Sequence, residues 1–140
     1  MRILFAVDGS SYTTKAADYL VDHLRHFNDS IELHLFHVEL PIIGHAAKYL
    51  GKALVDNYYK EESEAAMASA EAILKKHNVP FQSSYTKGDA ALEIQKYAKK
   101  NKIDMIVMGS HGHGALKNLV MGSVANKVLA CTNIPVLIVR

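Results

Sequence analysis

The 140-residue sequence has one cysteine, Cys131, so no disulfide bond can form within the chain. It also has little excess charge, because sixteen Lys and Arg residues against fourteen Asp and Glu residues leave a formal net charge of +2. That field is too weak to favour binding to nucleic acid or to an anionic membrane surface. The apolar run at residues 3–7 is shorter than a signal-peptide core, and no stretch approaches the length of a membrane-spanning helix. These absences predict a cytoplasmic protein.

What is present is the composition of a folded interior. Hydrophobic residues make up 49% of the chain and charged residues 21%, which is typical of a globular protein with a substantial core. The length suits one ordinary domain, and no linker-like tract, low-complexity segment or internal repeat divides it. We therefore expect a single domain over residues 1–140.

Short apolar runs alternate with longer amphipathic segments along the chain. The runs predict strands at residues 3–7, 31–38, 81–85, 103–108 and 135–139. The segments between them predict helices that end near residue 28, cover about 53–77, open at 88–89 and cover about 116–130. The first and fourth strands are apolar on both faces, whereas Glu32 and His34 predict a second strand that is less deeply buried.

This alternation predicts the α/β fold class. We expect a single-domain, open, five-stranded parallel sheet with helices on both faces and the strand order 3-2-1-4-5. Such sheets bind ligands beyond the carboxyl ends of the strands, at the point where the winding reverses. The loops that follow Val7 and Met108 are therefore the expected carriers of function.

The loop after the fourth strand has the chemistry of a phosphate site. It reads Gly109-Ser110-His111-Gly112-His113-Gly114 and leads to a helix that contains Gly122-Ser123. Glycines let the backbone approach a ligand, free N–H groups form an anion-binding nest, and a helix N-terminus adds donors. The loop is not a Walker loop, because Ala115 stands where lysine is required, nor a dinucleotide fingerprint, because the third glycine is missing. A tight turn that merely needs glycine is the alternative.

Asp8 ends the first strand and is expected to face the same crevice. A carboxylate there would repel phosphate, so ribose hydroxyls or a bridging metal ion are its expected partners, with helix capping as the alternative. A receiver domain with Asp8 as phospho-acceptor is excluded, because that design needs an acidic cluster after the first strand and its acceptor after the third. Here Asp8 is solitary, and Tyr85-Thr86-Lys87 follows the third strand.

These segments together resemble the universal stress protein family over the whole chain. The similarity lies in the opening Ile3-Leu4-Phe5-Ala6-Val7-Asp8-Gly9-Ser10, in Phe36-His37-Val38 and in the ending Asn133-Ile134-Pro135-Val136-Leu137-Ile138-Val139. The most specific feature is the family's nucleotide motif, Gly-x2-Gly-x9-Gly-Ser/Thr, which stands here as Gly109, Gly112, Gly122 and Ser123. Members that keep this motif bind ATP, so the resemblance implies an ATP-binding member. The extra glycine in His113-Gly114 is a departure within the x9 stretch.

The resemblance also implies which residues would hold the nucleotide. Asp8 would contact the ribose, and the backbone around Ala6, Val7 and Val38 would hold the adenine. The sugar and phosphates would be wrapped by Met108, Gly109, Ser110, His111 and Gly112. The phosphate tail would lie against Gly122, Ser123 and the amides of Val124 and Ala125. Mg²⁺ would arrive on the nucleotide, because it needs few protein ligands.

Other chemistry is less well supplied by the sequence. His111 and His113 form a His-x-His pair, but no third ligand stands near them, so a dedicated metal site is disfavoured. Ser110 and Ser123 lack a nucleophile elbow and acid–base partners, so acyl transfer is disfavoured too. We predict an ATP-binding regulatory or signalling module without catalytic residues. The alternatives are a slow ATPase or phosphotransfer enzyme and a nucleotide-free dimeric interaction protein.

The last strand, residues 135–139, is expected to form an exposed apolar edge, because no later element shields it. Pairing this strand between two copies would give a closed two-fold interface, and the resemblance implies the same homodimer. After the second strand, the segment 40–58 carries Pro41, Gly44 and Gly51 and is expected to form a flap over the nucleotide.

Overall fold

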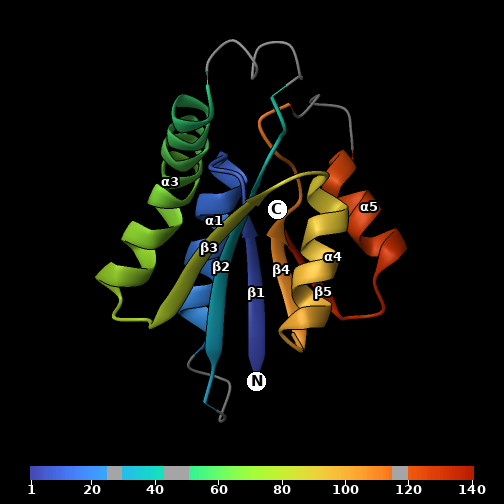
Figure 1. The fold of residues 1–140 in the computed structure, drawn as a ribbon. Helices are drawn as coiled ribbons and strands as arrows, with labels where there is room; N and C mark the ends of the chain where they lie inside the picture. Colours follow the sequence, from blue (N-terminus) through green and yellow to red (C-terminus); the bar gives the residue numbers. More distant parts are fainter. Residues whose placement is uncertain (25–29, 43–50, 115–119) are drawn as a thin grey trace.

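The computed structural model describes residues 1–24, 30–42, 51–114 and 120–140, in which strands and helices alternate (Figure 1). The strands are β1 (Arg2–Val7), β2 (Glu32–Glu39), β3 (Phe81–Lys87), β4 (Met105–Gly109) and β5 (Val136–Val139). The helices are α1 (Ser11–Leu24), α3 (Lys52–Lys76), α4 (Ala90–Lys100) and α5 (Ser123–Cys131). None of these described helices combines the length and the apolar character that crossing a membrane requires.

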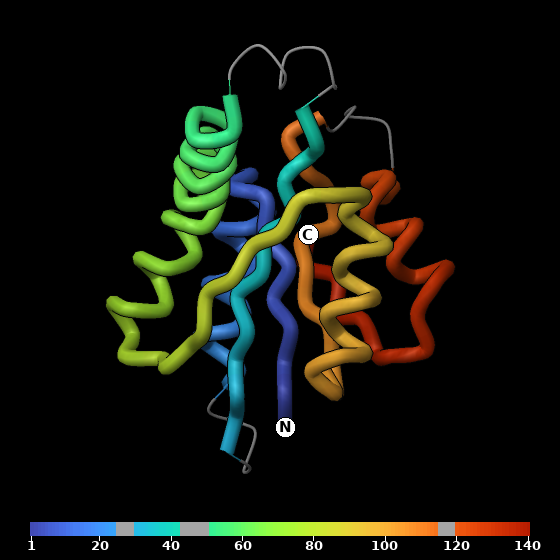
Figure 2. The backbone as a smooth tube through the Cα atoms, in the orientation of Figure 1, coloured from blue at the N-terminus to red at the C-terminus, as the bar shows by residue number. Residues whose placement is uncertain are grey.

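All five strands run parallel in one sheet of order β3-β2-β1-β4-β5, which confirms the predicted fold class and strand order. β1 lies at the centre, where Phe5 pairs with Leu35 of β2 on one side and with Val107 of β4 on the other. The winding therefore reverses between β1 and β4. Figure 2 shows the N-terminus at the amino end of β1, and the C-terminus directly follows the carboxyl end of β5.

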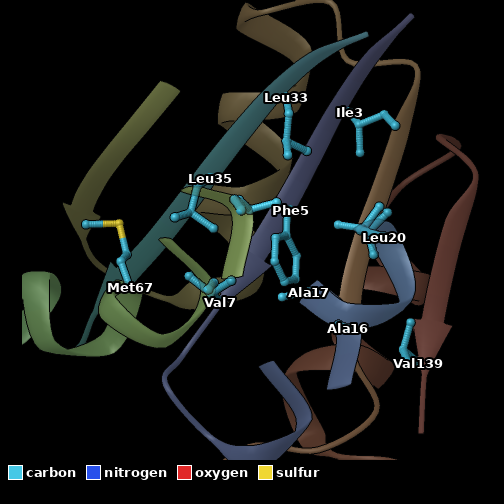
Figure 3. Packing of buried hydrophobic residues seen from close by; sticks show 13 residues of the cluster. Ile3, Phe5, Val7, Ala16, Ala17, Leu20, Leu33, Leu35, Met67 and Val139 are labelled. Carbon is cyan, nitrogen blue, oxygen red and sulfur yellow. The ribbon is translucent and has the colours of Figure 1, made fainter. Parts of the chain in front are cut away.

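Helices cover both faces of the sheet, and each face has its own core. α1 and α3 pack on one face, where Ile3 and Phe5 are fully buried (Figure 3). α4 and α5 pack on the other face, where Leu4 and Ile106 are fully buried. β1 sends alternate side chains into the two cores, which is why its sequence is apolar throughout. Each of these buried side chains contributes about 1.5–3 kcal/mol relative to exposure.

The start of α5 differs from the prediction. The sequence predicts a helix over about 116–130, but the structure begins α5 at Ser123. Residues 115–119 lie outside the described ranges, and the residues between them and α5 are not helical. Gly122 has extended backbone angles, and its N–H donates to the carbonyl of Ser110 at 2.7 Å. That bond ties the chain to the glycine loop, so the helix starts only after it.

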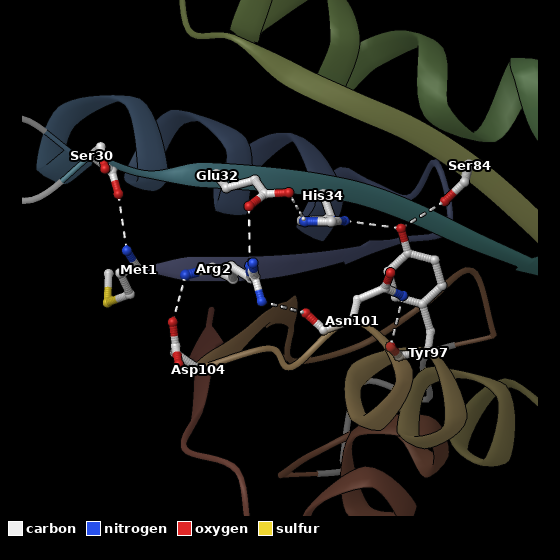
Figure 4. A network of polar contacts seen from close by, with 9 residues as sticks. All are labelled: Met1, Arg2, Ser30, Glu32, His34, Ser84, Tyr97, Asn101 and Asp104. Carbon is white, nitrogen blue, oxygen red and sulfur yellow. Dashed lines mark hydrogen bonds and ion pairs between the residues drawn. The ribbon is translucent and has the colours of Figure 1, made fainter.

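A polar network joins the strands near their amino ends (Figure 4). The prediction that Glu32 and His34 lessen the burial of the second strand holds for Glu32, which is exposed, and is wrong for His34, which is only 4% exposed. Its Nδ1 lies 3.0 Å from the Tyr97 hydroxyl and its Nε2 lies 3.1 Å from Glu32 Oε1, so both ring nitrogens have partners. The Nε–H of Arg2 donates to Glu32 Oε2 at 3.1 Å and holds the pKa of Glu32 below its usual value.

The segment 40–58, predicted to form a flap, is described only in part. Residues 43–50 lie outside the described ranges, and the flap stays a prediction there. From Lys52 onward the chain forms the first turns of α3, which corrects the extent of the flap. Before the gap, the N–H of Ile42 donates to the hydroxyl of Tyr59 at 2.8 Å, so the end of β2 is tied to α3.

Candidate functional site

A cavity of about 420 Å³ opens at the carboxyl ends of β1 and β4. The sequence predicts the ligand site at this position, because the winding of the sheet reverses there. Every residue that the sequence analysis assigns to the site lines this cavity: Ala6, Val7, Asp8, Val38, Met108, Gly109, Ser110, His111, Gly112, Gly122, Ser123, Val124 and Ala125. The fold therefore gathers all of them into one place.

Asp8 has one carboxylate oxygen engaged by the chain and one turned toward the glycine loop. Its Oδ1 accepts hydrogen bonds from the N–H of Ser10 at 3.0 Å and from the hydroxyl of Thr13 at 2.9 Å, so it stabilises the turn into α1. Its Oδ2 lies so near Gly112 that a Cβ placed on that glycine would be 2.5 Å away. The capping role and the crevice-facing role, which the sequence leaves as alternatives, coexist in one side chain.

The glycines of the loop after β4 permit close approaches between backbones. A Cβ on Gly109 would lie 2.6 Å from the Cβ of Tyr12 in α1, and one on Gly112 would meet Asp8. A Cβ on Gly122 would lie 3.2 Å from the carbonyl oxygen of Ser110. Contacts below 3.0 Å force neighbouring atoms to move. At Gly109 the nearest atoms are the Cβ and backbone of Tyr12, so this position needs glycine for packing, whatever ligand the loop holds; at Gly112 the close atom is the terminal Oδ2 of Asp8.

The loop is joined to both neighbours of β4. The buried Ser110 donates its N–H to the carbonyl of Val139 at 2.7 Å. On the other side, His113 Nε2 donates to the carbonyl of Asp8 at 2.8 Å, and the ring of His111 packs against Tyr12 with centroids 5.1 Å apart. The two histidines thus contact different groups, and the described residues contain no cluster of three or more His, Cys, Asp or Glu suited to a metal ion.

The first turns of α1, α4 and α5 all contribute to the cavity lining, and α4 and α5 differ in how their N-termini are capped. At α4, Asp89 accepts from the N–H of Leu92 at 3.1 Å, and this bond, aided by Lys127, holds the pKa of Asp89 below its usual value. At α5, the N-cap residue Gly122 offers no side-chain hydrogen bond. The amides of the first turn of α5 therefore remain donors for an anion in the cavity.

The opposite wall of the cavity is apolar. It is formed by side chains of β2, of the residue that follows β2, of β4 and of α4: Phe36, Val38, Leu40, Met108 and Ile94. The cavity lining that the sequence analysis does not assign comprises Thr13, Phe36, Leu40, Ala90, Ile94, His113 and Gly114. Spacing carries a signal for one of these residues, because Phe36 is two residues before Val38 on a strand and therefore lies on the same face.

Comparison with known proteins gives a consistent family match. A sequence model described as the universal stress protein family matches residues 1–140. Universal stress protein YxiE of Bacillus subtilis is 31% identical over 147 residues, which cover 99% of this chain and 98% of YxiE.

Solved structures share the fold. Protein MJ0577 of Methanocaldococcus jannaschii aligns with a TM-score of 0.76 at 28% identity, over 99% of this chain and 94% of that one. The Archaeoglobus fulgidus universal stress protein in complex with dAMP has a TM-score of 0.72 at 18% identity, over 100% and 98%. Two others, a complex with cAMP and an Arabidopsis thaliana protein with AMP bound, have TM-scores of 0.70 and 0.67 at 19% and 16% identity. They cover 100% and 99% of this chain, and 96% and 90% of their own.

Proposed function

The chain belongs to the universal stress protein family, and we propose that it binds an adenine nucleotide, ATP, between β1 and β4 and acts as a regulatory or signalling module. One observation carries the proposal: a single cavity combines a carboxylate, a helix N-terminus without a side-chain cap and an apolar wall. A ribose, a phosphate chain and a purine need these three surfaces respectively. The dAMP, cAMP and AMP complexes of structurally similar family members support the choice of an adenine nucleotide.

In this proposal each part of the nucleotide has its own surface. The adenine lies against the apolar wall, next to the backbone of Ala6, Val7 and Val38. The ribose hydroxyls donate to Asp8, whose Oδ2 is the oxygen not used by the turn into α1. The phosphates lie along the loop from Met108 to Gly112 and against the first turn of α5. The glycine motif supports this arrangement because its residues line the cavity.

Mg²⁺ fits the site only as a companion of the nucleotide. Among the described lining residues, Asp8 is the one carboxylate, and its Oδ1 already accepts two hydrogen bonds. Mg²⁺ keeps several waters and takes its remaining ligands from phosphate oxygens. The ion would neutralise phosphate charge, while the chain's own contribution is the row of backbone donors.

The proposal is tested by the nucleotide that the purified protein carries. Mass spectrometry of the small molecules released on denaturation should identify an adenine nucleotide. Titration calorimetry with ATP should then give a dissociation constant near the micromolar range, about 8 kcal/mol of binding free energy. GTP serves as the matched control with the same phosphate chain. Absence of any adenine-nucleotide binding would leave the nucleotide-free dimeric interaction protein as the function.

Turnover of the bound ATP should be slow or absent. Rapid phosphoryl transfer needs a cation on the γ-phosphate and a group that positions the attacking water. The described cavity lining holds no lysine or arginine, and Lys117 lies outside the described ranges. Phosphate release should fall well below the roughly 1–100 s⁻¹ of working kinases. A rate within that range, abolished by substituting His111 or His113, would make the protein an enzyme.

The proposed assembly is a homodimer formed through the last strand, in the cytoplasm. β5 is the terminal strand of the sheet, and Leu137 and Ile138 are only partly buried within one chain. Unpaired apolar edges promote association, and pairing identical edges gives a closed dimer. Light scattering at micromolar concentration should give twice the chain mass of 15.5 kDa. A mass near that of one chain would exclude the dimer.

A further inference from the structure

A buried histidine lies behind the site, outside the lining of the cavity. His37 on β2 is 6% exposed. Its Nδ1 lies 2.8 Å from the carbonyl oxygen of Val7, and its Nε2 lies 3.1 Å from Glu39 Oε2. Because a carbonyl can only accept, Nδ1 carries the hydrogen and donates it. The last carbonyl of β1 is therefore held by a side chain of the neighbouring strand.

The other polar atom of the same peptide group is held as well. The N–H of Asp8 donates to the hydroxyl oxygen of Thr13 at 3.1 Å, and that hydroxyl donates onward to Asp8 Oδ1 at 2.9 Å. Thr13 is 2% exposed and belongs to α1. Val7 is the last residue of β1 that pairs with β2, so ladder pairing with that strand ends just before Asp8. Beyond that point, two buried side chains from separate elements replace the ladder.

We infer that His37 and Thr13 are positioning residues, which clamp the planar Val7–Asp8 peptide and thereby aim the Asp8 carboxylate into the cavity. A peptide group is rigid, so fixing its carbonyl and its N–H fixes its orientation and the direction in which the next side chain leaves the backbone. The next residue is Gly9 with φ +79°, where the chain turns sharply, so the extended course of β1 does not continue past Asp8. The part of this inference that concerns ligand affinity rests on the proposed function.

Packing alone does not account for a histidine at this position. Leu33 and Leu35 are the buried apolar residues on the same face of this strand, and a leucine at position 37 would avoid burying polar ring atoms. The Glu39 carboxylate also orients the imidazole ring, because its Oε2 contacts Nε2 of His37. Glu39 is held in turn, since its Oε1 accepts a hydrogen bond from the N–H of Leu40 at 3.1 Å. This second contact keeps Nδ1 directed at the carbonyl of Val7.

The test compares variants that keep or remove the donor to Val7. The amide nitrogen of asparagine stands near the position of Nδ1, so His37→Asn retains that donor, whereas His37→Leu removes it. The matched control is His34→Leu: His34 is equally buried on the same strand and also contacts a carboxylate two residues away, but it lies near the amino ends (Figure 4). Thr13→Val against Thr13→Ser forms the second pair, in which only serine keeps the hydroxyl.

Two measurements are made on each folded variant. One is the exchange rate of the Asp8 amide hydrogen in the nucleotide-free protein, and the other is the dissociation constant for ATP. We expect His37→Leu and Thr13→Val to speed that exchange and to weaken ATP binding about tenfold, the effect of one lost hydrogen bond. His37→Asn and Thr13→Ser should stay close to the original chain. His34→Leu should leave both measurements unchanged, even where it lowers the melting temperature.

The clamp is overturned if His37→Leu leaves the Asp8 amide exchange and the ATP affinity as they were. It is equally overturned if His34→Leu changes both as much, because the effect would then be one of general stability. Failure of the proposed function is a separate result. If the original chain binds no nucleotide, faster Asp8 exchange in His37→Leu still supports the clamp, and unchanged exchange refutes it.

Discussion

Replacing Asp8 by asparagine and by alanine should separate its two roles. Oδ1 accepts hydrogen bonds from Ser10 and Thr13, whereas Oδ2 is turned toward the glycine loop. Asp8→Asn keeps a carbonyl oxygen for the first role and replaces the charged acceptor that the second role requires. Asp8→Ala removes both acceptors.

The expected magnitudes follow from these contacts. A hydrogen bond to a charged group is worth about 1.5–3 kcal/mol, so both variants should weaken ATP binding by about one to two decades. Only Asp8→Ala leaves the N–H of Ser10 and the hydroxyl of Thr13 without their acceptor, which costs roughly 1–3 kcal/mol for each group that water does not reach. Asp8→Ala should therefore also lower the free energy of unfolding, and Asp8→Asn should change it little.

Titration calorimetry with ATP and urea unfolding of the same preparations measure the two effects. If Asp8→Asn bound ATP with the dissociation constant of the original chain, the proposed contact between Asp8 and the ribose would be refuted. Equal losses of unfolding free energy in the two variants would refute the role assigned to Oδ1. The two readouts are independent, so each role stands or fails on its own result.

Two further predictions concern the fold around the site and the amino end of the sheet. Gly109→Ala should lower the free energy of unfolding in urea by about 1–3 kcal/mol, because its Cβ would lie 2.6 Å from the Cβ of Tyr12. Gly114 has open space around it, so the control Gly114→Ala should change this free energy little. Equal effects of the two substitutions would contradict the packing argument. The pKa of Glu32 is lower in the folded chain than its ordinary value of about 4.5 in the unfolded chain. The resulting stability is present above the unfolded-state pKa and is lost as the pH falls through the folded-state pKa. Between pH 6 and about 3, the urea concentration at the midpoint of unfolding should therefore fall less in Arg2→Met than in the original chain. An equal fall in both proteins would show that the Arg2 hydrogen bond does not stabilise the fold.

The fold class was predictable because the pattern of apolar residues along the chain depends directly on which strands and helices are buried. The run at 3–7 is apolar at every position, and only a strand buried on both faces, here β1, demands that. The strand order rested in addition on the common topology of such chains, because alternation alone is compatible with other orders. The start of α5 was not predictable, because it depends on the hydrogen bond from Gly122 to Ser110, which joins residues twelve positions apart in the sequence.

The position of the cavity was predictable from the sequence, and the buried hydrogen bonds around it were not. Asp8 and the glycine loop follow two strands that a parallel sheet brings together, so their meeting needs no knowledge of side-chain contacts. His34, His37 and Thr13 are polar residues whose burial depends on partners in other elements. Residue type alone favours exposure for such side chains, and the hydrogen bonds that reverse this preference appear only in three dimensions.

The loops on the two sides of the cavity are joined before any ligand arrives. His113 donates to the carbonyl of Asp8, and the hydroxyl of Ser10 donates to the carbonyl of His111 at 3.4 Å. A ligand that has to immobilise a flexible side chain loses roughly 0.5–1.5 kcal/mol for each one. Here that loss of conformational entropy occurs when the chain folds, so it lowers the free energy of unfolding and does not reduce the free energy of ligand binding. For the proposed nucleotide, affinity at this cavity is therefore expected to depend on the loop geometry that folding fixes.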